Sequence, residues 1–487
     1  MAKNIMIQGS MSNVGKSIIA AAICRILRQD GYRVAPFKSQ NMALNSFITE
    51  DGGEMGRAQV VQAECAGIKP DVRMNPILLK PTSDVGSQVI VMGKVQGSMR
   101  AMEYFRHKRE YIPQILEAYN SLAAENDIIV IEGAGSPAEL NLKQDDIVNM
   151  GLAKLVDAPL LLVGDIDRGG IFAQLYGTVA LLDEDERKRI KGTVVNKFRG
   201  DKAIFSPAVK MLEDICKVPV AGIVPYVHVD IDDEDSLSRR FDKKSKPGLI
   251  NIAVVKLPRI SNFTDFAPFE RFENVAVSYV DKPSELCGAD LIILPGTKST
   301  IADLLWLRQT GFETEIYKAA SAGTPVFGIC GGMQMLGFEI SDPEGLESAN
   351  MQEIKGMELL KISTRFSGEK VQKQSRGVIQ GVTGIFSTVN GLDYTGYEIH
   401  MGRSGDEALP VVCSGNVYGS YIHGLFDSRD VSETIIKALC EKKNLNFESF
   451  GGHDTATLKE QEYDKLAAAV RAGLDMEYIY KIINREV

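Results

Sequence analysis

Short apolar runs alternate with amphipathic segments along the first half of the chain. Residues 3–9 form an apolar run that predicts a strand, and residues 16–31 place Ile and Leu side chains on one helical face before Gly31 ends the segment. Further apolar runs predict strands at residues 32–38, 127–133, 158–166 and 190–198. Strands that alternate with helices are typical of a parallel sheet covered by helices, so we predict an α/β domain.

A second set of apolar runs follows a charged stretch. Residues 229–248 carry mainly acidic residues first and basic residues after, and we interpret them as a solvated linker rather than a charged docking segment. Strand-like runs resume at residues 249–257, 275–280, 289–296, 324–330 and 416–424, and residues 300–308 have a helical pattern. We therefore predict a first α/β domain at residues 1–228, a second at 249–435, and a helical C-terminal segment at 436–487.

Composition excludes several classes of protein. The chain of 487 residues has a formal net charge of -9, which would repel a polyanion, so we expect no nucleic-acid partner. Its seven cysteines are scattered without a C-x-x-C pair, which argues against a disulfide framework or a zinc site and favours a reducing cytoplasm. No apolar run approaches the length of about eighteen residues that a membrane span needs. The oligomeric state is left open.

Residues 9–17, GSMSNVGKS, lie between the first predicted strand and helix. They contain one residue more than the usual G-x-x-x-x-G-K-[ST] loop. Turn amides and a helix N-terminus point toward a bound phosphate in such a loop. We predict that Gly9, Gly15, Lys16 and Ser17 bind ATP, with Lys16 on the β and γ phosphates and Ser17 on Mg²⁺. The longer loop resembles the dethiobiotin synthetase-like branch of P-loop enzymes, in which ATP activates a carboxylate.

Magnesium needs further oxygen ligands beside the phosphates. Glu132 comes at the end of a predicted strand, at the edge of a parallel sheet where ligands collect, and Asp51 is a second candidate. Asn196 opens the segment NKFRGD after another predicted strand. We interpret it as a contact of adenine, although this segment could equally be a plain turn.

A candidate nucleophile lies in the second domain. Cys330 stands in FGICGG between a short apolar strand and a helical segment, and small flanking residues are what a sharp strand-to-helix turn requires. His423, in YGSYIHG, is the candidate base that activates it. The amides around Gly296 and Gly331 are candidates for stabilising an oxyanion. The alternatives are a buried structural cysteine and a core histidine.

The second domain resembles class I glutamine amidotransferases, in which a cysteine attacks the side-chain amide of glutamine and ammonia is released. Most of that class has Glu two residues after the histidine, where this chain has Leu425, so the partner of His423 is open. The branch that acts on cobyrinic acids shares this departure. Segments over nearly the whole chain resemble the cobyric acid synthase family: GSMSNVGKS (9–17), FKSQNMALNS (37–46), GRAQVVQAECAG (56–67), MNPILLKP (74–81), EGAGSPAELNL (132–142), DIDRGGIFAQLYGT (165–178) and YEIHMG (397–402).

This resemblance implies a dethiobiotin synthetase-like P-loop domain followed by a class I glutamine amidotransferase domain. It implies that ATP, Mg²⁺ and glutamine convert adenosylcobyrinic acid a,c-diamide into adenosylcobyric acid, by amidation of the b, d, e and g carboxylates through acyl phosphates. For this anionic corrinoid we predict contacts with Lys38, Arg57, Lys80 and Arg168, Lys38 being an alternative contact of the phosphates. His400 could orient a catalytic group or line a passage between the domains.

Three other interpretations are weighed against this one. The sister enzyme that makes the a,c-diamide would share both domains. The identity of the product separates the two, and the segments FKSQNMALNS and NPILLKP favour the later enzyme. A regulatory P-loop ATPase of the partitioning type would have a degenerate second domain, against which Cys330 and His423 argue. A ligase like cytidine triphosphate synthase is disfavoured by Leu425 and by the unlike phosphate loop.

Overall fold

A six-stranded parallel sheet forms the centre of the first domain in the computed structural model, which describes residues 2–83, 86–232, 247–347, 351–405, 409–450 and 455–487. The strand order is β12 (Val220–Pro225), β11 (Ile190–Phe198), β10 (Leu160–Asp165), β1 (Lys3–Gly9), β9 (Ile128–Glu132) and β2 (Val34–Phe37), all parallel. Ile5 and Ile7 of β1 join one buried cluster and Met6 joins another, so both faces of the sheet are covered. The predicted parallel α/β domain is confirmed.

Helices on each face of this sheet bury the apolar stripes that the sequence shows. The first, α1 (Lys16–Gln29), buries Ile19, Ile23 and Ile26 against one face. The other face is packed by α4 (Ile112–Glu125), α5 (Met150–Leu155), α6 (Ile171–Leu181) and α8 (Lys202–Cys216). Helix α2 (Arg57–Ala66) contributes to both clusters, and α3 (Ala101–His107) and α7 (Glu184–Arg189) complete the domain.

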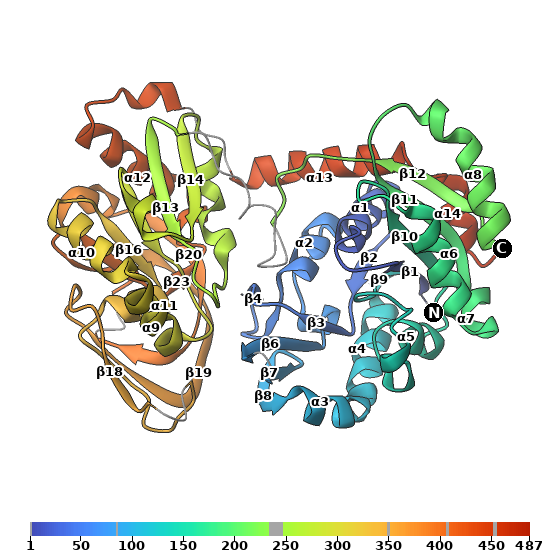
Figure 1. Cartoon of the computed structure of the whole chain (residues 1–487), viewed down its shortest axis with the longest axis horizontal. Coiled ribbons are helices and arrows are strands. Elements are labelled where there is room, and N and C mark those ends of the chain that lie inside the picture. The colour runs from blue at the N-terminus through green and yellow to red at the C-terminus, as the bar shows by residue number, and fades with distance from the viewer. Residues whose placement is uncertain (1, 84–85, 233–246, 348–350, 406–408, 451–454) are drawn as a thin grey trace.

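Residues 40–100 add strands that the sequence analysis does not predict. A four-stranded sheet has the order β3 (Gln40–Met42), β6 (Ile77–Ser83), β7 (Gly86–Val91) and β8 (Lys94–Arg100). A separate hairpin pairs β4 (Ser46–Ile48) with β5 (Glu54–Gly56) and leads directly into α2. These strands lie on the side of the first domain that faces the second (Figure 1).

Two sheets form the second domain. The larger has the order β14 (Val275–Val280), β13 (Ile250–Val255), β15 (Leu291–Leu294), β16 (Val326–Ile329), β22 (Val417–Ser420) and β21 (Val412–Ser414), with only β21 antiparallel. The smaller has the order β18 (Glu353–Lys355), β17 (Glu339–Ser341), β19 (Ser363–Val378), β20 (Asp393–Ser404) and β23 (Ile422–His423). Helices α9 (Thr300–Thr310), α10 (Phe312–Ser321) and α11 (Gly331–Leu336) follow β15 and β16. The second predicted α/β domain is confirmed as well.

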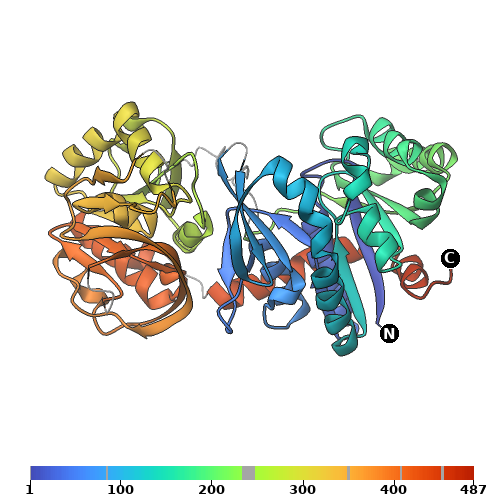
Figure 2. The same cartoon turned by 90° about the horizontal axis from the view of Figure 1, so that it is seen from below.

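The C-terminal helices divide between the two domains. Helix α12 (Arg429–Lys442) packs into the core of the second domain. Helices α13 (Thr455–Arg471) and α14 (Met476–Ile483) pack instead on the first, where Leu466 and Val470 join the cluster around α1. Figures 1 and 2 show α13 extending from the side of the second domain across the first. Of the predicted linker, residues 233–246 lie outside the described residues. Among the described helices, none is long and apolar enough to cross a membrane.

Candidate active sites

The phosphate loop follows β1 and ends at Gly15, the residue immediately before α1. Gly15 has a φ of 100°, and a Cβ there would collide with the side-chain amide of Asn196, so only glycine fits. The loop folds back closely on itself, because a Cβ at Gly9 would lie 2.6 Å from Cγ2 of Val14. The additional residue is therefore accommodated between β1 and α1, and the predicted strand, turn and helix are present.

Lys16 and Ser17, the first residues of α1, both point toward the carboxyl edge of the sheet. The ammonium of Lys16 is buried and donates to the carbonyls of Met11, 3.1 Å away, and Gly135, 3.0 Å away. The hydroxyl of Ser17 donates to Oε1 of Glu132 at 2.8 Å. The ammonium of Lys16 thus connects the phosphate loop with the turn that follows β9. The hydroxyl of Ser17 binds Glu132, the predicted magnesium ligand at the end of β9.

Glu132 is the centre of a buried polar cluster at this edge. It forms an ion pair with Lys38 at 3.0 Å and accepts hydrogen bonds from Gln62 at 2.6 Å and Gln59 at 3.3 Å. A serine hydroxyl and a carboxylate are hard oxygen ligands of the kind that Mg²⁺ takes together with phosphate oxygens. Ser17 and Glu132 therefore fit a magnesium site. Lys38 contacts Glu132 and therefore lies beside this candidate magnesium site. This position is compatible with the alternative role given to Lys38 above, a contact with the phosphates.

Asp51 lies apart from this cluster. It is an exposed residue in the turn of the β4–β5 hairpin, where its carboxylate accepts a hydrogen bond from the hydroxyl of Thr49. The structure does not bring it together with Ser17 and Glu132. The β4–β5 hairpin carries Asp51 toward the second domain instead.

Asn196 and one side chain that the sequence analysis missed, Lys197, both support the phosphate loop. Asn196 donates through Nδ2 to the carbonyl of Val14 at 2.7 Å. Lys197 donates to the carbonyl of Asn13 at 2.6 Å and to Asp165 at 2.7 Å. The described contacts of Asn196 thus support the loop, and its role toward adenine stays a prediction. The signal available for Lys197 was the pair Asn-Lys near the carboxyl end of a strand.

The candidate nucleophile lies at the turn between β16 and α11. Cys330 has φ 49° and ψ −109°, a conformation that residues with a side chain seldom adopt. Its amide donates to the carbonyl of Ser420 at 2.8 Å, and its Sγ lies 3.7 Å from the carbonyl of Ile399. Gly332 is required here because a Cβ would collide with the carbonyl of Leu294. FGICGG forms the predicted strand-to-helix turn.

His423 is buried between Cys330 and an aspartate that the sequence analysis missed. Its Nδ1 lies 2.7 Å from Oδ2 of Asp265, and the amide of Gly424 donates to the other oxygen at 3.1 Å. Burial alone would lower the pKa of His423, but the charge of Asp265 and hydrogen bonds with Asp265 and Cys330 raise it to about 10. The imidazole therefore keeps a proton at neutral pH. The position of the usual glutamate, Leu425, is buried and apolar.

The two glycines predicted for an oxyanion site lie beside this pair. A Cβ at Gly331 would be 3.2 Å from the backbone nitrogen of Thr297, so the turn after Cys330 meets the turn after β15. A Cβ at Gly296 would be 3.1 Å from Cε1 of His423. The structure thus brings Cys330, His423, Gly296 and Gly331 together in one place.

Comparisons with known proteins agree with this pair of sites. The profile of the CobQ/CobB/MinD/ParA nucleotide binding domain matches residues 5–237, and that of the CobB/CobQ-like glutamine amidotransferase domain matches residues 251–431. The cobyric acid synthases of Lachnoclostridium phytofermentans and Ruminiclostridium cellulolyticum are each 57% identical to the chain, over all of it and over 100% and 98% of their own lengths. That of Alkaliphilus metalliredigens is 49% identical over 99% of this chain and 100% of its own. The chain belongs to the cobyric acid synthase family.

Two of the basic residues predicted to bind substrate have another role in this member of the family. Arg57 is buried, and Asp232 accepts from its Nη2 at 2.6 Å and its Nε at 3.1 Å. Lys80 is buried and donates to Glu54 and to the hydroxyl of Ser46, both at 2.9 Å. Since each charge is already paired away from solvent, the structure argues against a direct contact of either with corrinoid carboxylates. Sequence alone shows the cation but not its carboxylate partner.

Arg168 is the fourth predicted contact of the substrate, and it differs from the other three. It is about half exposed, in the loop after β10, with its Nε 3.8 Å from Asp165. This loop lies at the same sheet edge as the phosphate loop, because β10 is the neighbour of β1. The half-exposed guanidinium of Arg168 can therefore contact an anion. The four basic residues predicted to bind the substrate do not form one cluster.

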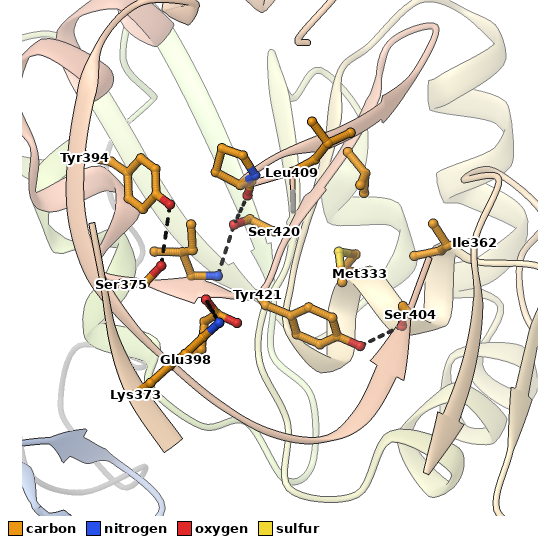
Figure 3. Close-up of a pocket in the computed structure, with 13 residues that line it drawn as sticks. Met333, Ile362, Lys373, Ser375, Tyr394, Glu398, Ser404, Leu409, Ser420 and Tyr421 are labelled. Carbon is orange, nitrogen blue, oxygen red and sulfur yellow. Dashed lines mark hydrogen bonds and ion pairs between the residues drawn. The ribbon is translucent and has the colours of Figure 1, made fainter. Parts of the chain in front are cut away.

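A cavity of about 130 Å³ in the second domain is lined by residues that include members of α11, β20 and β22 (Figure 3). Its wall includes Ser420, which holds the Cys330 amide, and Met333 of α11. An ion pair of Lys373 with Glu398 at 3.2 Å also lines it. His400 lies nearby on β20, hydrogen-bonded to the carbonyl of Gly402 and stacked on the ring of Tyr421. Cys330 and His423 are not among the described residues that line this cavity.

Proposed function

We propose that the protein is a glutamine- and ATP-dependent ligase that amidates the b, d, e and g carboxylates of adenosylcobyrinic acid a,c-diamide to give adenosylcobyric acid. The observation that carries this proposal is the presence of two complementary sites in one chain: Cys330 with His423 and Asp265, and Lys16 with Ser17 and Glu132. The full-length identity with cobyric acid synthases supports the choice of substrate.

The second domain would supply ammonia. The thiolate of Cys330 attacks the side-chain carbonyl carbon of glutamine, and His423, charged by the proton of the thiol, gives that proton to the departing ammonia. Asp265 stabilises the imidazolium and fixes the orientation of the ring. Amides of the turns at Gly296 and Gly331 stabilise the oxyanion. Water then hydrolyses the thioester, which releases glutamate and restores the thiol.

The first domain would activate the acceptor. A carboxylate does not react with ammonia, because its oxygen is a poor leaving group, whereas an acyl phosphate loses phosphate readily. The loop amides and Lys16 hold the phosphates of ATP, and Lys38 neutralises charge beside Glu132. Mg²⁺ held by Ser17 and Glu132 would stabilise the negative charge of the phosphates. Arg168 stays a candidate contact for a corrinoid carboxylate.

Coupling both reactions in one protein keeps ammonia from being lost to protonation in bulk water. We place the reaction in the cytoplasm, where ATP and glutamine are available. The state of the cysteines supports this location, because all seven are free thiols in the structure.

The test is mass spectrometry of adenosylcobyrinic acid a,c-diamide incubated with the protein, MgATP and glutamine carrying nitrogen-15 in its amide. We expect sequential products with up to four labelled amides. A parallel reaction with cobyrinic acid separates the sister activity, which would add amides at a and c only. An unchanged corrinoid with glutamate released would refute this acceptor, and no glutamate at all would support the regulatory ATPase instead.

A further inference from the structure

Ser46, the first residue of β4, forms contacts with both domains. Its amide donates to Oδ1 of Asn262 at 3.1 Å, and its carbonyl accepts from the hydroxyl of Tyr397 at 2.9 Å. Both of these partners belong to the second domain. Its own hydroxyl accepts from Lys80 of the first domain at 2.9 Å. All four residues are buried, so the contacts are shielded from water.

Both partners in the second domain lead directly to the glutaminase residues. Asn262 immediately precedes the 3₁₀ helix η5 (Phe263–Arg271), and its carbonyl accepts from the amide of Asp265 at 3.1 Å. Tyr397 lies opposite His423 in the β20–β23 pair, and its ring stacks on the imidazole with 5.5 Å between the centroids. The backbone of Ser46 therefore holds the two elements that carry Asp265 and His423.

On its other side, Ser46 connects to the phosphate site through covalently continuous structure. It pairs with Gly56 across the β4–β5 hairpin, and α2 begins at the next residue. Gln59 and Gln62 of α2 are two of the side chains that donate to Glu132, beside Ser17 and Lys38. A shift of α2, when the hydrogen bonds around Glu132 change, would be transmitted to Ser46.

The hairpin is also clamped to the second domain by charge. Glu54 of β5 is fully buried and lies 2.9 Å from Lys80 and 2.6 Å from Lys370 of β19. Gln372 of β19 donates to the same carboxylate at 3.0 Å. These contacts hold the β4–β5 hairpin against β19, so that a movement of the hairpin would act on the second domain.

We propose that Ser46 is a positioning residue that couples the two active sites. Its contacts hold His423 and Asp265 in their productive geometry when the site around Glu132 is occupied. The proposal rests on the proposed function, since it assumes a glutaminase and an ATP site in one enzyme. It assigns to the first domain the control of glutamine hydrolysis: glutamine is cleaved rapidly only when MgATP and the corrinoid occupy their site.

The experiment removes the cross-domain contacts one at a time. Tyr397→Phe deletes the hydroxyl bound to Ser46 and keeps the ring on His423. Asn262→Gly deletes the amide and keeps a backbone that tolerates the φ of 51° at this residue. Tyr394→Phe is the matched control, because it deletes a hydroxyl of the same strand that lies 3.5 Å from Ser375. Glutamate release is measured for each protein with and without MgATP and the a,c-diamide, beside amide formation from free ammonia.

We expect MgATP and corrinoid to stimulate glutamate release by the wild type and Tyr394→Phe at least about fivefold, the lower end of typical coupling between sites. Tyr397→Phe and Asn262→Gly should lose most of that stimulation while they form amide from ammonia at the wild-type rate, a combination that general damage to the fold would not give. Full stimulation in both variants, or none in the wild type, would overturn the proposal. Absence of ammonia-dependent amide formation in the wild type would count against the proposed function, and the response of glutamate release to MgATP would still decide on the coupling.

Discussion

Oδ2 of Asp265 lies 2.7 Å from Nδ1 of His423, although 158 residues separate the two along the chain. This aspartate takes the place that a glutamate two residues after the histidine has in most class I amidotransferases. Asp265 belongs to η5, near the start of the second domain, whereas His423 lies near its end. His423 thus has a carboxylate partner although position 425 is a leucine.

Asp265→Asn tests this assignment. The substitution keeps the shape of the side chain but removes the charge that stabilises the imidazolium, so we expect kcat for glutamine-dependent amidation to fall by about 10²- to 10⁴-fold. Amide formation from free ammonia should stay within about twofold, because the first domain is not altered. Asp281→Asn, at an exposed position of the same domain, is the control. An unchanged kcat for glutamine would mean that Asp265 does not act on His423.

The ion pair of His423 with Asp265 also predicts a dependence of stability on pH. The pKa of His423 is about 10 in the folded protein, against its ordinary value of 6.5. A raised pKa gives stabilisation that is complete below the unfolded value and is lost as the pH rises through the folded value. The wild type should thus exceed Asp265→Asn in unfolding temperature at pH 6, and the difference should disappear toward pH 10. A difference that grows with pH would contradict the ion pair.

Cys330→Ala separates the two half-reactions. Without the thiol no thioester can form, so glutamine-dependent synthesis should be abolished while ammonia-dependent synthesis persists. Cys413→Ala, a half-buried thiol elsewhere in the second domain, should leave both activities intact. The measurement is amide formation with each nitrogen donor. A folded Cys330→Ala protein that ammonia fails to rescue would rule out two independent sites.

What the sequence predicts well is local. The strands of both parallel sheets, the phosphate loop and the turn at Cys330 each depend on residues within about ten positions, so the pattern of apolar residues and glycines is sufficient to find them. His423 was found because few histidines occur in the chain and one follows a strand. The β4–β5 hairpin was missed, since its strands are only three residues long and show no clear alternation.

Contacts between distant segments are what the sequence could not show. Asp265 stands in NFTDFAPF, and the only available signal was one acidic residue within an apolar segment. Arg57 and Lys80 were interpreted as substrate contacts because their partners, Asp232 and Glu54, come from other elements. In the same way, nothing in the periodicity of α13 indicates that it packs on the first domain rather than the second.

Lys16→Ala should abolish synthesis with either nitrogen donor. Lys16 is the cation of the phosphate loop, and without it no acyl phosphate would form, whichever donor supplies the nitrogen. Lys3→Ala, which removes an exposed lysine at the start of β1, is the control. The measurement is release of phosphate from ATP in the presence of the corrinoid. Retention of phosphate release would place the nucleotide elsewhere in the chain.

Glu54→Gln should destabilise the protein, because it leaves the buried ammonium of Lys80 without its carboxylate. Lys370 loses the same partner, but burial lowers the pKa of its amine to about 7, so this group can release its proton in the variant. Removing one partner of a buried ion pair costs about 3–5 kcal/mol. Burial would raise the pKa of Glu54, but Lys370 and Lys80 hold it well below its ordinary value, so the stabilisation is present above pH 4.5 and lost on acidification.

The thermal unfolding midpoints of the wild type and Glu54→Gln, compared at pH 7 and at a series of pH values falling below 4.5, check this, with Glu50→Gln as the matched control. Glu50 pairs with Lys69 at 2.8 Å on the surface of the first domain, where both side chains are exposed. Loss of that pair should change stability by no more than about 0.5 kcal/mol. A Glu54→Gln protein as stable as the control at pH 7 would show that the clamp between β5 and β19 contributes nothing net, and the hairpin could then not act rigidly on the second domain.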